Sequence, residues 1–275
     1  MSTAPLLWIA VALGAGTASA QPAPSLEEFS VVRFTPAPGP GNYLSTDSTT
    51  VGGHLVPSAG LMVDYAHNPF VLYGAFCDAV DPTNCDVTAV DTRLVRYTLT
   101  GHIFATLGLF DRVQVGLMVP VAYLESDRFA YTEVISGNIV SVGGGDKGGV
   151  GDPRLVAKAR LFDTDAGFGL GASAFMTVPL GQVVAEGSYI GEDTVTGGGR
   201  IIADFHAAPF HVAANFGGIV RPERVLFSTS VGSEFVYSGA LAYDLTQLLT
   251  IMAEVQGASS FSADTDENPL EARGA

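Results

Sequence analysis

Residues 96–125 read RYTLTGHIFATLGLFDRVQVGLMVPVAYLE, two alternating segments joined by a short turn at residues 109–112. In the first segment Leu99 and Ile103 share one parity, and polar residues such as Thr100 take the other. Because successive side chains of a strand point to opposite faces, the pattern predicts a hairpin with one apolar and one polar face. Each arm has about ten residues, the length that a tilted strand needs to cross a bilayer.

The same alternation recurs along the chain. We predict about nine strands, at residues 61–65, 96–107, 113–123, 154–161, 168–178, 200–206, 211–216, 234–244 and 248–256. Short connections at 109–112, 162–166, 207–209 and 244–247 alternate with long ones at 77–86, 126–149, 181–194, 222–229 and from 260 onward. Bacterial outer-membrane barrels alternate short periplasmic turns with long extracellular loops in this way. The predicted fold is therefore all-β, an antiparallel up-and-down transmembrane β-barrel.

The composition agrees with strands that face lipid. Hydrophobic residues make up 47% of the chain and charged residues only 15%, against about a quarter charged in average proteins. No uninterrupted apolar run has the length of a transmembrane helix. A water-soluble β-sandwich is the alternative fold.

The formal net charge of −15 argues against nucleic acid as a partner, because nucleic-acid binding needs a basic surface. The acidic residues gather in the connections between strands. Two interpretations stay open: solvated loop tips, or loops that bind a lipopolysaccharide surface through divalent cations. The expected partners are accordingly outer-membrane lipid and lipopolysaccharide.

The chain divides into three predicted parts. Residues 1–20 have a short apolar core and end in Ala18-Ser19-Ala20, which predicts a cleaved signal peptide, although no Lys or Arg precedes the core. Residues 21–57 are rich in proline and glycine, so we expect an irregular lead-in, either ordered or a flexible linker. Residues 58–275 are the predicted outer-membrane barrel.

The two cysteines, Cys77 and Cys85, lie in one predicted long loop. An exported chain meets an oxidising compartment, so we predict a disulfide between them. A zinc site is a weaker alternative because no histidine or second cysteine pair lies nearby.

Charged residues also occur on the polar faces of the predicted strands. They are Arg96, Arg154, Lys158, Arg160 and Arg200, with Asp64, Asp204, Glu234, Asp244 and Glu254, and His102, His206 and His211 among them. We select as lumen-lining residues Arg96, His102, Lys158, Arg160, Arg200, Asp204, Glu234 and Glu254. Charges inside a barrel must pair or touch water. They either brace a narrow barrel through salt bridges or line a selective pore.

No motif predicts catalysis, a metal or a cofactor. His206 and His211 flank a short turn, but the sequence places no third metal ligand beside them. The glycine-rich residues 143–149 lack the spacing of a phosphate-binding loop, so we expect a mobile loop there. There is also no Gly-x-Ser-x-Gly motif. We therefore expect a protein that is not an enzyme.

A resemblance to a known family supports the barrel. Residues 29–42 (FSVVRFTPAPGPGN), Gly53-His54 and residues 58–65 (SAGLMVDY) resemble the opening of the barrel region of large OmpA-family outer-membrane proteins. The resemblance continues through the mature chain in its pattern of strands and turns. It implies an outer-membrane location and a structural role in the envelope, and it supplies no catalytic residues. A narrow channel for small solutes is the alternative function.

The expected strand number is odd, whereas bacterial single-chain barrels have even numbers. The tail at residues 261–275 is polar, contains Pro269 and has no terminal aromatic residue, so we expect an outer loop there. In the family that the chain resembles, further strands and a peptidoglycan-binding domain follow. We therefore expect an incomplete part of a barrel of about ten to twelve strands. The sheet should be open, with its first strand not paired to residues 248–256.

Overall fold

The computed structural model describes residues 30–77, 85–132, 139–164, 166–181, 189–226, 229–261 and 270–274. The strands are β1 (Pro57–Cys77), β2 (Cys85–Leu109), β3 (Val113–Thr132), β4 (Ile139–Val150), β5 (Arg154–Asp163), β6 (Phe168–Thr177), β7 (Thr196–Ala207), β8 (Phe210–Val220), β9 (Arg224–Leu226), β10 (Thr229–Val231), β11 (Glu234–Thr246), β12 (Leu249–Ser260) and β13 (Leu270–Gly274). Within the described residues, no helix has the length and hydrophobicity needed to span a membrane.

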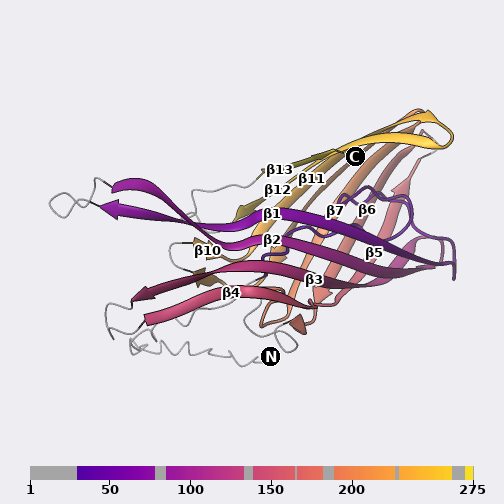
Figure 1. The fold of residues 1–275 in the computed structure, drawn as a ribbon. Coiled ribbons are helices and arrows are strands. Elements are labelled where there is room, and N and C mark those ends of the chain that lie inside the picture. The colour runs from indigo at the N-terminus through magenta and orange to yellow at the C-terminus, as the bar shows by residue number, and fades with distance from the viewer. Residues whose placement is uncertain are drawn as a thin grey trace, which may run out of the picture.

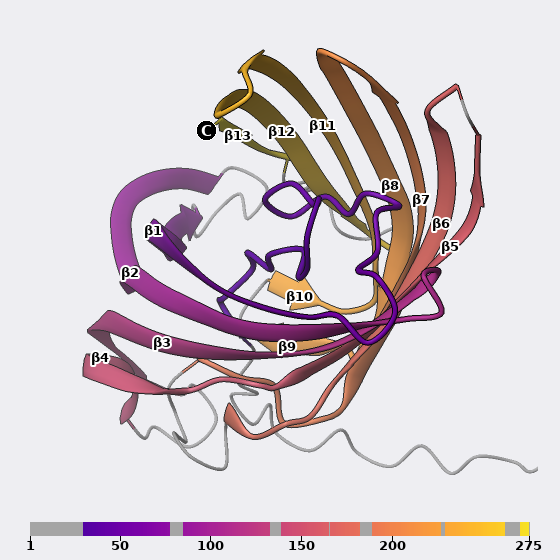
Figure 2. The ribbon, with the colours of Figure 1, turned by 90° about the vertical axis from the view of Figure 1, so that its right-hand side faces the viewer.

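Eleven strands form one antiparallel sheet with the order β1-β2-β3-β5-β6-β7-β8-β11-β12-β13, and β4 pairs with β3 off this path. Strands β9 and β10 form a separate two-stranded sheet. The large sheet curls around an axis into an open barrel (Figures 1 and 2). Among the described residues β1 does not pair with β12 or β13, so the sheet keeps two edges. The predicted all-β, incomplete up-and-down barrel is confirmed.

All nine predicted spanning strands are present, and the structure adds two strands to the sheet. The glycine-rich residues 143–149, predicted as a mobile loop, belong to β4, which pairs with the end of β3. That prediction was wrong because a strand ladder is made by backbone groups, which glycine also supplies: Gly148 pairs with Tyr123, and Gly143 pairs with Arg128. The polar tail, expected as a loop, contains β13, which pairs with residues 253–257 of β12.

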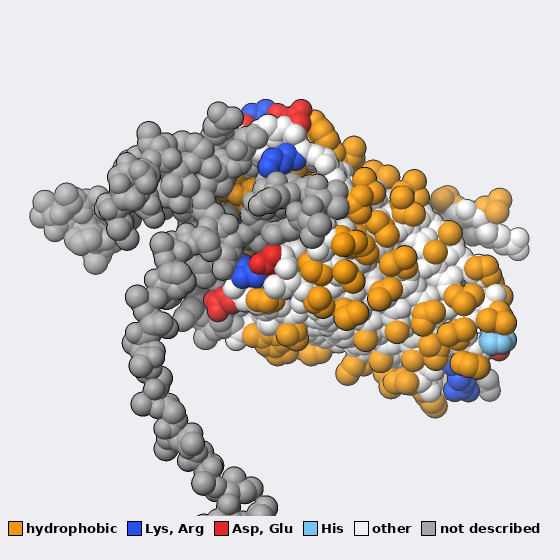
Figure 3. All heavy atoms as spheres, turned by 90° about the horizontal axis from the view of Figure 1, so that it is seen from below, with side chains coloured by type: hydrophobic (Ala, Val, Ile, Leu, Met, Phe, Trp, Pro, Cys, Tyr) orange, Lys and Arg blue, Asp and Glu red, His pale blue; other side chains and the backbone are white. Residues whose placement is uncertain are grey.

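The two faces of the sheet differ as the alternation requires. The outward face carries exposed apolar side chains on the nine predicted strands, including Leu61, Leu99, Ile103, Leu117, Leu155, Met176, Ile201, Phe216, Leu241 and Ile251. In Figure 3 hydrophobic side chains spread over the wall, while charged side chains are seen near its two ends. The opposite face of β2 buries Thr98, Thr100 and His102. This is the reverse of a water-soluble protein, in which apolar side chains are buried.

The barrel has two distinct ends. We call the end with the connections β2–β3, β5–β6, β7–β8 and β11–β12 the short-turn end. The other, with the connections β1–β2, β6–β7, β8–β11 and β12–β13, is the long-loop end. The β1–β2 hairpin extends past the rest of the sheet at the long-loop end (Figure 1).

Residues 30–56, which we call the inner segment, lie inside the barrel as irregular chain (Figure 2). The segment begins at the long-loop end, where Val31 N donates to Tyr189 O at 3.0 Å. It finishes at the short-turn end, where Leu55 N donates to Gly108 O at 2.8 Å and the chain enters β1. The expected lead-in is therefore ordered over these residues and fills the interior of the barrel.

The main apolar cluster lies at the start of the inner segment. It contains Val31, Leu94, Val95, Ala122, Leu124, Tyr189, Ile190 and Val231, which come from the inner segment, the wall and two long-loop connections. A smaller cluster packs Tyr43 against Ala213, Ala240 and Ala242 of the wall. Apolar packing therefore holds the inner segment at two levels, and polar contacts hold residues 42–49 around the second level.

Candidate functional site

The candidate site is the filled lumen, where the polar residues 42–49 of the inner segment meet polar side chains of the wall. Five strands supply these side chains: β5, β6 (through Ser173, which donates to Asp47 Oδ2 at 3.3 Å), β7, β8 and β12. Every wall residue involved lies on the inward parity of its strand, so the alternation that exposes apolar side chains also presents these groups to the inner segment.

Glu254 on β12 binds the inner segment through both carboxylate oxygens. Its Oε2 accepts a hydrogen bond from Leu44 N at 2.9 Å, and its Oε1 accepts one from Ser45 N at 2.9 Å. The Ser45 hydroxyl also donates to Glu254 Oε1. A buried carboxylate is stable here because charge-assisted hydrogen bonds replace its water.

Asn215 on β8 pairs with the backbone of Asp47. Its Oδ1 accepts from Asp47 N at 2.7 Å, and its Nδ2 donates to Asp47 O at 2.8 Å. Nearby on β7, Arg200 donates to Ser45 O at 3.3 Å. An irregular buried chain has no neighbouring strand to satisfy its backbone N–H and C=O groups, and these hydrogen bonds satisfy them instead.

Asp204 on β7 holds Thr49. Its Oδ2 accepts from Thr49 N at 2.6 Å, and its Oδ1 accepts from the Thr49 hydroxyl at 2.9 Å. Gly169 on β6 makes this approach possible, since a Cβ there would lie 2.3 Å from both Thr49 Oγ1 and Asp204 Oδ1.

Lys158 on β5 is 1% exposed and binds the same stretch of the inner segment. Its Nζ donates to Asn42 Oδ1 at 2.8 Å and to Ser48 O at 3.1 Å, and it lies 3.9 Å from Asp47 Oδ1. Lys158 is thus the more deeply buried of the two cations in the network, the other being Arg200, and Asp47 is the anion beside it.

Tyr43 is close enough to two carboxylates of the network, Asp204 and Glu254, to feel their charges. Its hydroxyl is buried without a hydrogen-bond partner among the described residues. Burial, together with the negative charges of Asp204 and Glu254, raises the pKa of Tyr43 to about 12. The phenol therefore stays neutral and adds apolar packing to the inner segment.

The other predicted lumen residues lie away from residues 42–49. His102 is buried, with Nε2 2.8 Å from Asp64 Oδ2. Glu234 lies between two arginines at the long-loop end. Arg96 is half-exposed and pairs with Glu125 and Asp127, each at 2.7 Å. Arg160 lies at the short-turn end, where it donates to Asp111 O at 2.6 Å. The structure therefore brings together Lys158, Arg200, Asp204 and Glu254 and separates the other four.

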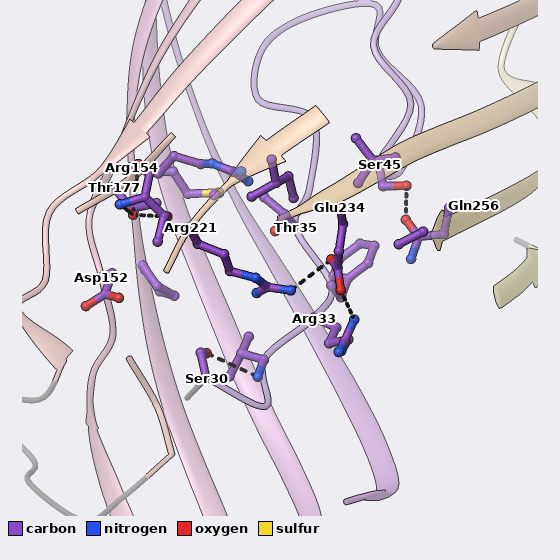
Figure 4. A pocket seen from close by; sticks show the side chains of 18 of the residues that line it. Ser30, Arg33, Thr35, Ser45, Asp152, Arg154, Thr177, Arg221, Glu234 and Gln256 are labelled. Carbon is purple, nitrogen blue, oxygen red and sulfur yellow. Dashed lines mark hydrogen bonds and ion pairs between the residues drawn. The ribbon is translucent and has the colours of Figure 1, made fainter. Parts of the chain in front are cut away.

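A cavity of about 210 Å³ lies between the inner segment and the wall, toward the long-loop end. Figure 4 shows Glu234 at its wall, between Arg33 at 3.3 Å and Arg221 at 2.8 Å. Arg221 is also 3.5 Å from Glu192. Burial raises the pKa of Glu192 in spite of this arginine, and burial likewise raises the pKa of Asp152.

His206 and His211 form a hydrogen-bonded chain at the short-turn end. Their Nδ1 atoms are 3.1 Å apart, and the Nε2 atoms lie 3.0 Å from Asp204 and 2.7 Å from Asp244. No group of three or more His, Cys, Asp or Glu side chains suited to a metal ion occurs in the part of the chain that the structure describes. The two carboxylates orient the two imidazoles.

Cys77 and Cys85 are paired by the backbone register as the last residues of β1 and the first of β2. Facing residues of antiparallel strands have Cα atoms about 4.5–5.5 Å apart, which lies within the range that a disulfide bridges. Their side chains lie outside the described part of the structure, so the disulfide stays a prediction.

Sequence reasoning missed the partners that the wall residues bind. Asn42, Ser45, Asp47 and Thr49 belong to a segment expected only as a lead-in, and Asn215 was not selected. The run STDSTT at residues 45–50 is the signal that was present. No family model matches the chain, and a search of curated proteins likewise finds no match.

Proposed function

We propose that this protein is an outer-membrane β-barrel with a structural role in the cell envelope. The inner segment braces the wall and obstructs the lumen. The observation that carries the proposal is the combination of an apolar outward face with an interior filled by hydrogen-bonded chain. Lipid is the solvent that suits such an outward face, because the antiparallel ladder satisfies the backbone groups of the paired strands without water.

The resemblance to large OmpA-family proteins supports the same role. In this proposal the partners are outer-membrane lipid and lipopolysaccharide, and a C-terminal domain would bind peptidoglycan. The proposed role is non-catalytic. The contacts of residues 42–49 favour bracing over conduction, because Lys158, Asp204 and Glu254 bind protein groups at the level where a pore would need water.

The alternative is a narrow channel for small solutes. The cavity beside the inner segment favours it, because charged side chains line that cavity and reach toward the long-loop end. Conduction would require the inner segment to move away from Glu254 and Asp204.

Two measurements test the proposal. The refolded chain should insert into liposomes with a β-dominated circular dichroism spectrum and heat-modifiable gel migration, whereas a monomer that is soluble without detergent would refute an outer-membrane location. In planar bilayers the wild type should show no steady conductance. The double variant Glu254→Gln/Asp204→Asn, which loosens the inner segment, should conduct more. Steady, salt-dependent conductance of the wild type would instead support the channel.

A further inference from the structure

One cation in the cavity wall has no anionic partner. Arg154, on β5, is only 9% exposed. No described residue forms a hydrogen bond or ion pair with it, and its Nε is buried without an acceptor. A buried charge is costly unless it is paired and hydrogen-bonded. The guanidinium group of Arg154 therefore lacks the partners that normally stabilise a buried cation.

The position of Arg154 is nevertheless well defined. Its guanidinium carbon lies 3.4 Å from the centre of the Phe175 ring on β6. The ring fits because Gly198 on β7 has no side chain: a Cβ there would lie 2.7 Å from Phe175 Cε1. The stacked ring supports one face of the guanidinium and leaves its hydrogen-bonding edge free.

A second arginine strengthens the positive charge. Arg200 on β7 acts on Arg154 as a like charge, and Asp47 of the inner segment offsets it only in part. The single hydrogen bond of Arg200 among the described residues goes to Ser45 O, an uncharged acceptor. Arg154 and Arg200 both line the cavity of about 210 Å³.

The other charged side chains of this cavity already have hydrogen-bond or ion-pair partners. Arg33 and Arg221 bind Glu234, and Arg221 also lies beside Glu192. Asp152 accepts hydrogen bonds from the backbone N–H groups of Gly181 and Glu192, at 2.8 and 2.7 Å. Among the charged side chains of this cavity, the described residues leave Arg154 without a hydrogen bond or ion pair and give Arg200 only a backbone acceptor.

The rest of the lining is partly apolar. Met118, Pro120, Ile190, Ile219 and Val236 contribute to it. We propose that the cavity binds a small organic oxyanion, a carboxylate or phosphate attached to an apolar body, on the guanidinium groups of Arg154 and Arg200. Guanidinium groups bind both head groups through paired N–H donors, and the apolar body packs against the aliphatic lining. This inference goes beyond the structural role and holds whether or not the barrel conducts.

Titration calorimetry of the refolded full chain in detergent tests the proposal. Benzoate and phenyl phosphate are the probes, and neutral benzamide and inorganic phosphate are the comparisons. Both probes should bind more tightly than benzamide, and phenyl phosphate should bind more tightly than inorganic phosphate. Equal affinity for benzamide would overturn the oxyanion site. Equal affinity for inorganic phosphate would overturn the role of the apolar lining. These comparisons use the wild type and do not depend on the folding of a variant.

Two arginine variants locate the site. Arg154→Met keeps an unbranched side chain over Phe175 and removes the charge, so probe affinity should fall about tenfold or more, as expected for losing hydrogen bonds to a charged group. Arg160→Met is the matched control, because it removes a cation of the same strand that lies at the short-turn end, outside the cavity. Its affinity should stay within about twofold of the wild type. A folded Arg154→Met protein, shown by heat-modifiable migration, that keeps full affinity would refute the assignment.

Discussion

Asn215 on the barrel wall pairs with the backbone of Asp47 in the inner segment through two hydrogen bonds, which run in opposite directions at 2.7 and 2.8 Å. The Asn215 side chain makes the two hydrogen bonds that a neighbouring strand would make to a residue in a sheet. Asp47 needs them because the inner segment is irregular chain. The inner segment is consequently fixed by wall side chains, while the strands of the wall are fixed by each other.

Replacing Asn215 should release the middle of the inner segment. Asn215→Ala leaves both backbone groups of Asp47 buried and unsatisfied, at about 1–3 kcal/mol for each group. We expect the hydrogen-exchange protection of the Asp47 amide to fall by at least about tenfold. Thr100→Ala is the control, because the Thr100 hydroxyl is equally buried and has no hydrogen-bond partner among the described residues. Unchanged protection in Asn215→Ala would show that packing alone holds the segment.

Lys158 should matter more for stability than its neighbour Arg160. Lys158→Met removes a buried cation from Asn42, Ser48 and Asp47, and breaking such a buried network costs about 3–5 kcal/mol. Arg160→Met, two residues along the same strand, removes a more exposed cation and should cost about 1 kcal/mol or less. Urea unfolding in liposomes, followed by gel migration, measures both. Equal losses would mean that Lys158 is hydrated in the membrane.

The sequence was sufficient to predict nine strands of the wall, because a strand's two faces are encoded by adjacent residues such as Leu99 and Thr100. The inner segment could not be predicted in this way. Ser45 and Glu254 are separated by 209 residues along the chain, and a run of Ser, Thr and Asp suits any solvated loop. For the same reason the sequence does not separate Lys158 from Arg154. Both lie on one parity of β5. Only the placement of the inner segment gives Lys158 its partners and leaves Arg154 without a hydrogen bond or ion pair among the described residues.

Acidification should stabilise the long-loop end. Burial raises the pKa values of Glu192 and Asp152, so the folded state favours their protonated forms. Their contribution to stability is present at low pH and is lost as the pH rises through the raised values. Exchange protection of the Val31 amide, corrected for intrinsic rates, should therefore increase from pH 7 to about pH 5. Glu192→Gln should weaken this dependence, while Asp163→Asn at the opposite end should leave it intact. A flat profile in the wild type would contradict the prediction.

The predicted disulfide can be tested at the far end of the β1–β2 hairpin. A thiol reagent should label Cys77 and Cys85 only after reduction, because the register places their backbones opposite each other. Reduction should loosen the hairpin tip and leave the unfolding of the barrel unchanged, since the bond closes only a short loop. Labelling of both cysteines without reduction would exclude the disulfide.

The outward face gives the most direct test of the membrane. Ile201 lies near the middle of β7 and is 61% exposed, whereas Leu248 lies in a short turn and is 99% exposed. In a bilayer Ile201→Arg should destabilise the barrel by about 2–4 kcal/mol, because the charge is placed near the hydrocarbon midplane. Leu248→Arg should cost about 0–1 kcal/mol, because the turn lies at the interface. In a water-soluble barrel both exposed changes would stay within about 0.5 kcal/mol. Urea unfolding in liposomes distinguishes the two cases. Equal, small effects at Ile201 and Leu248 would remove the physical basis for placing this wall in lipid.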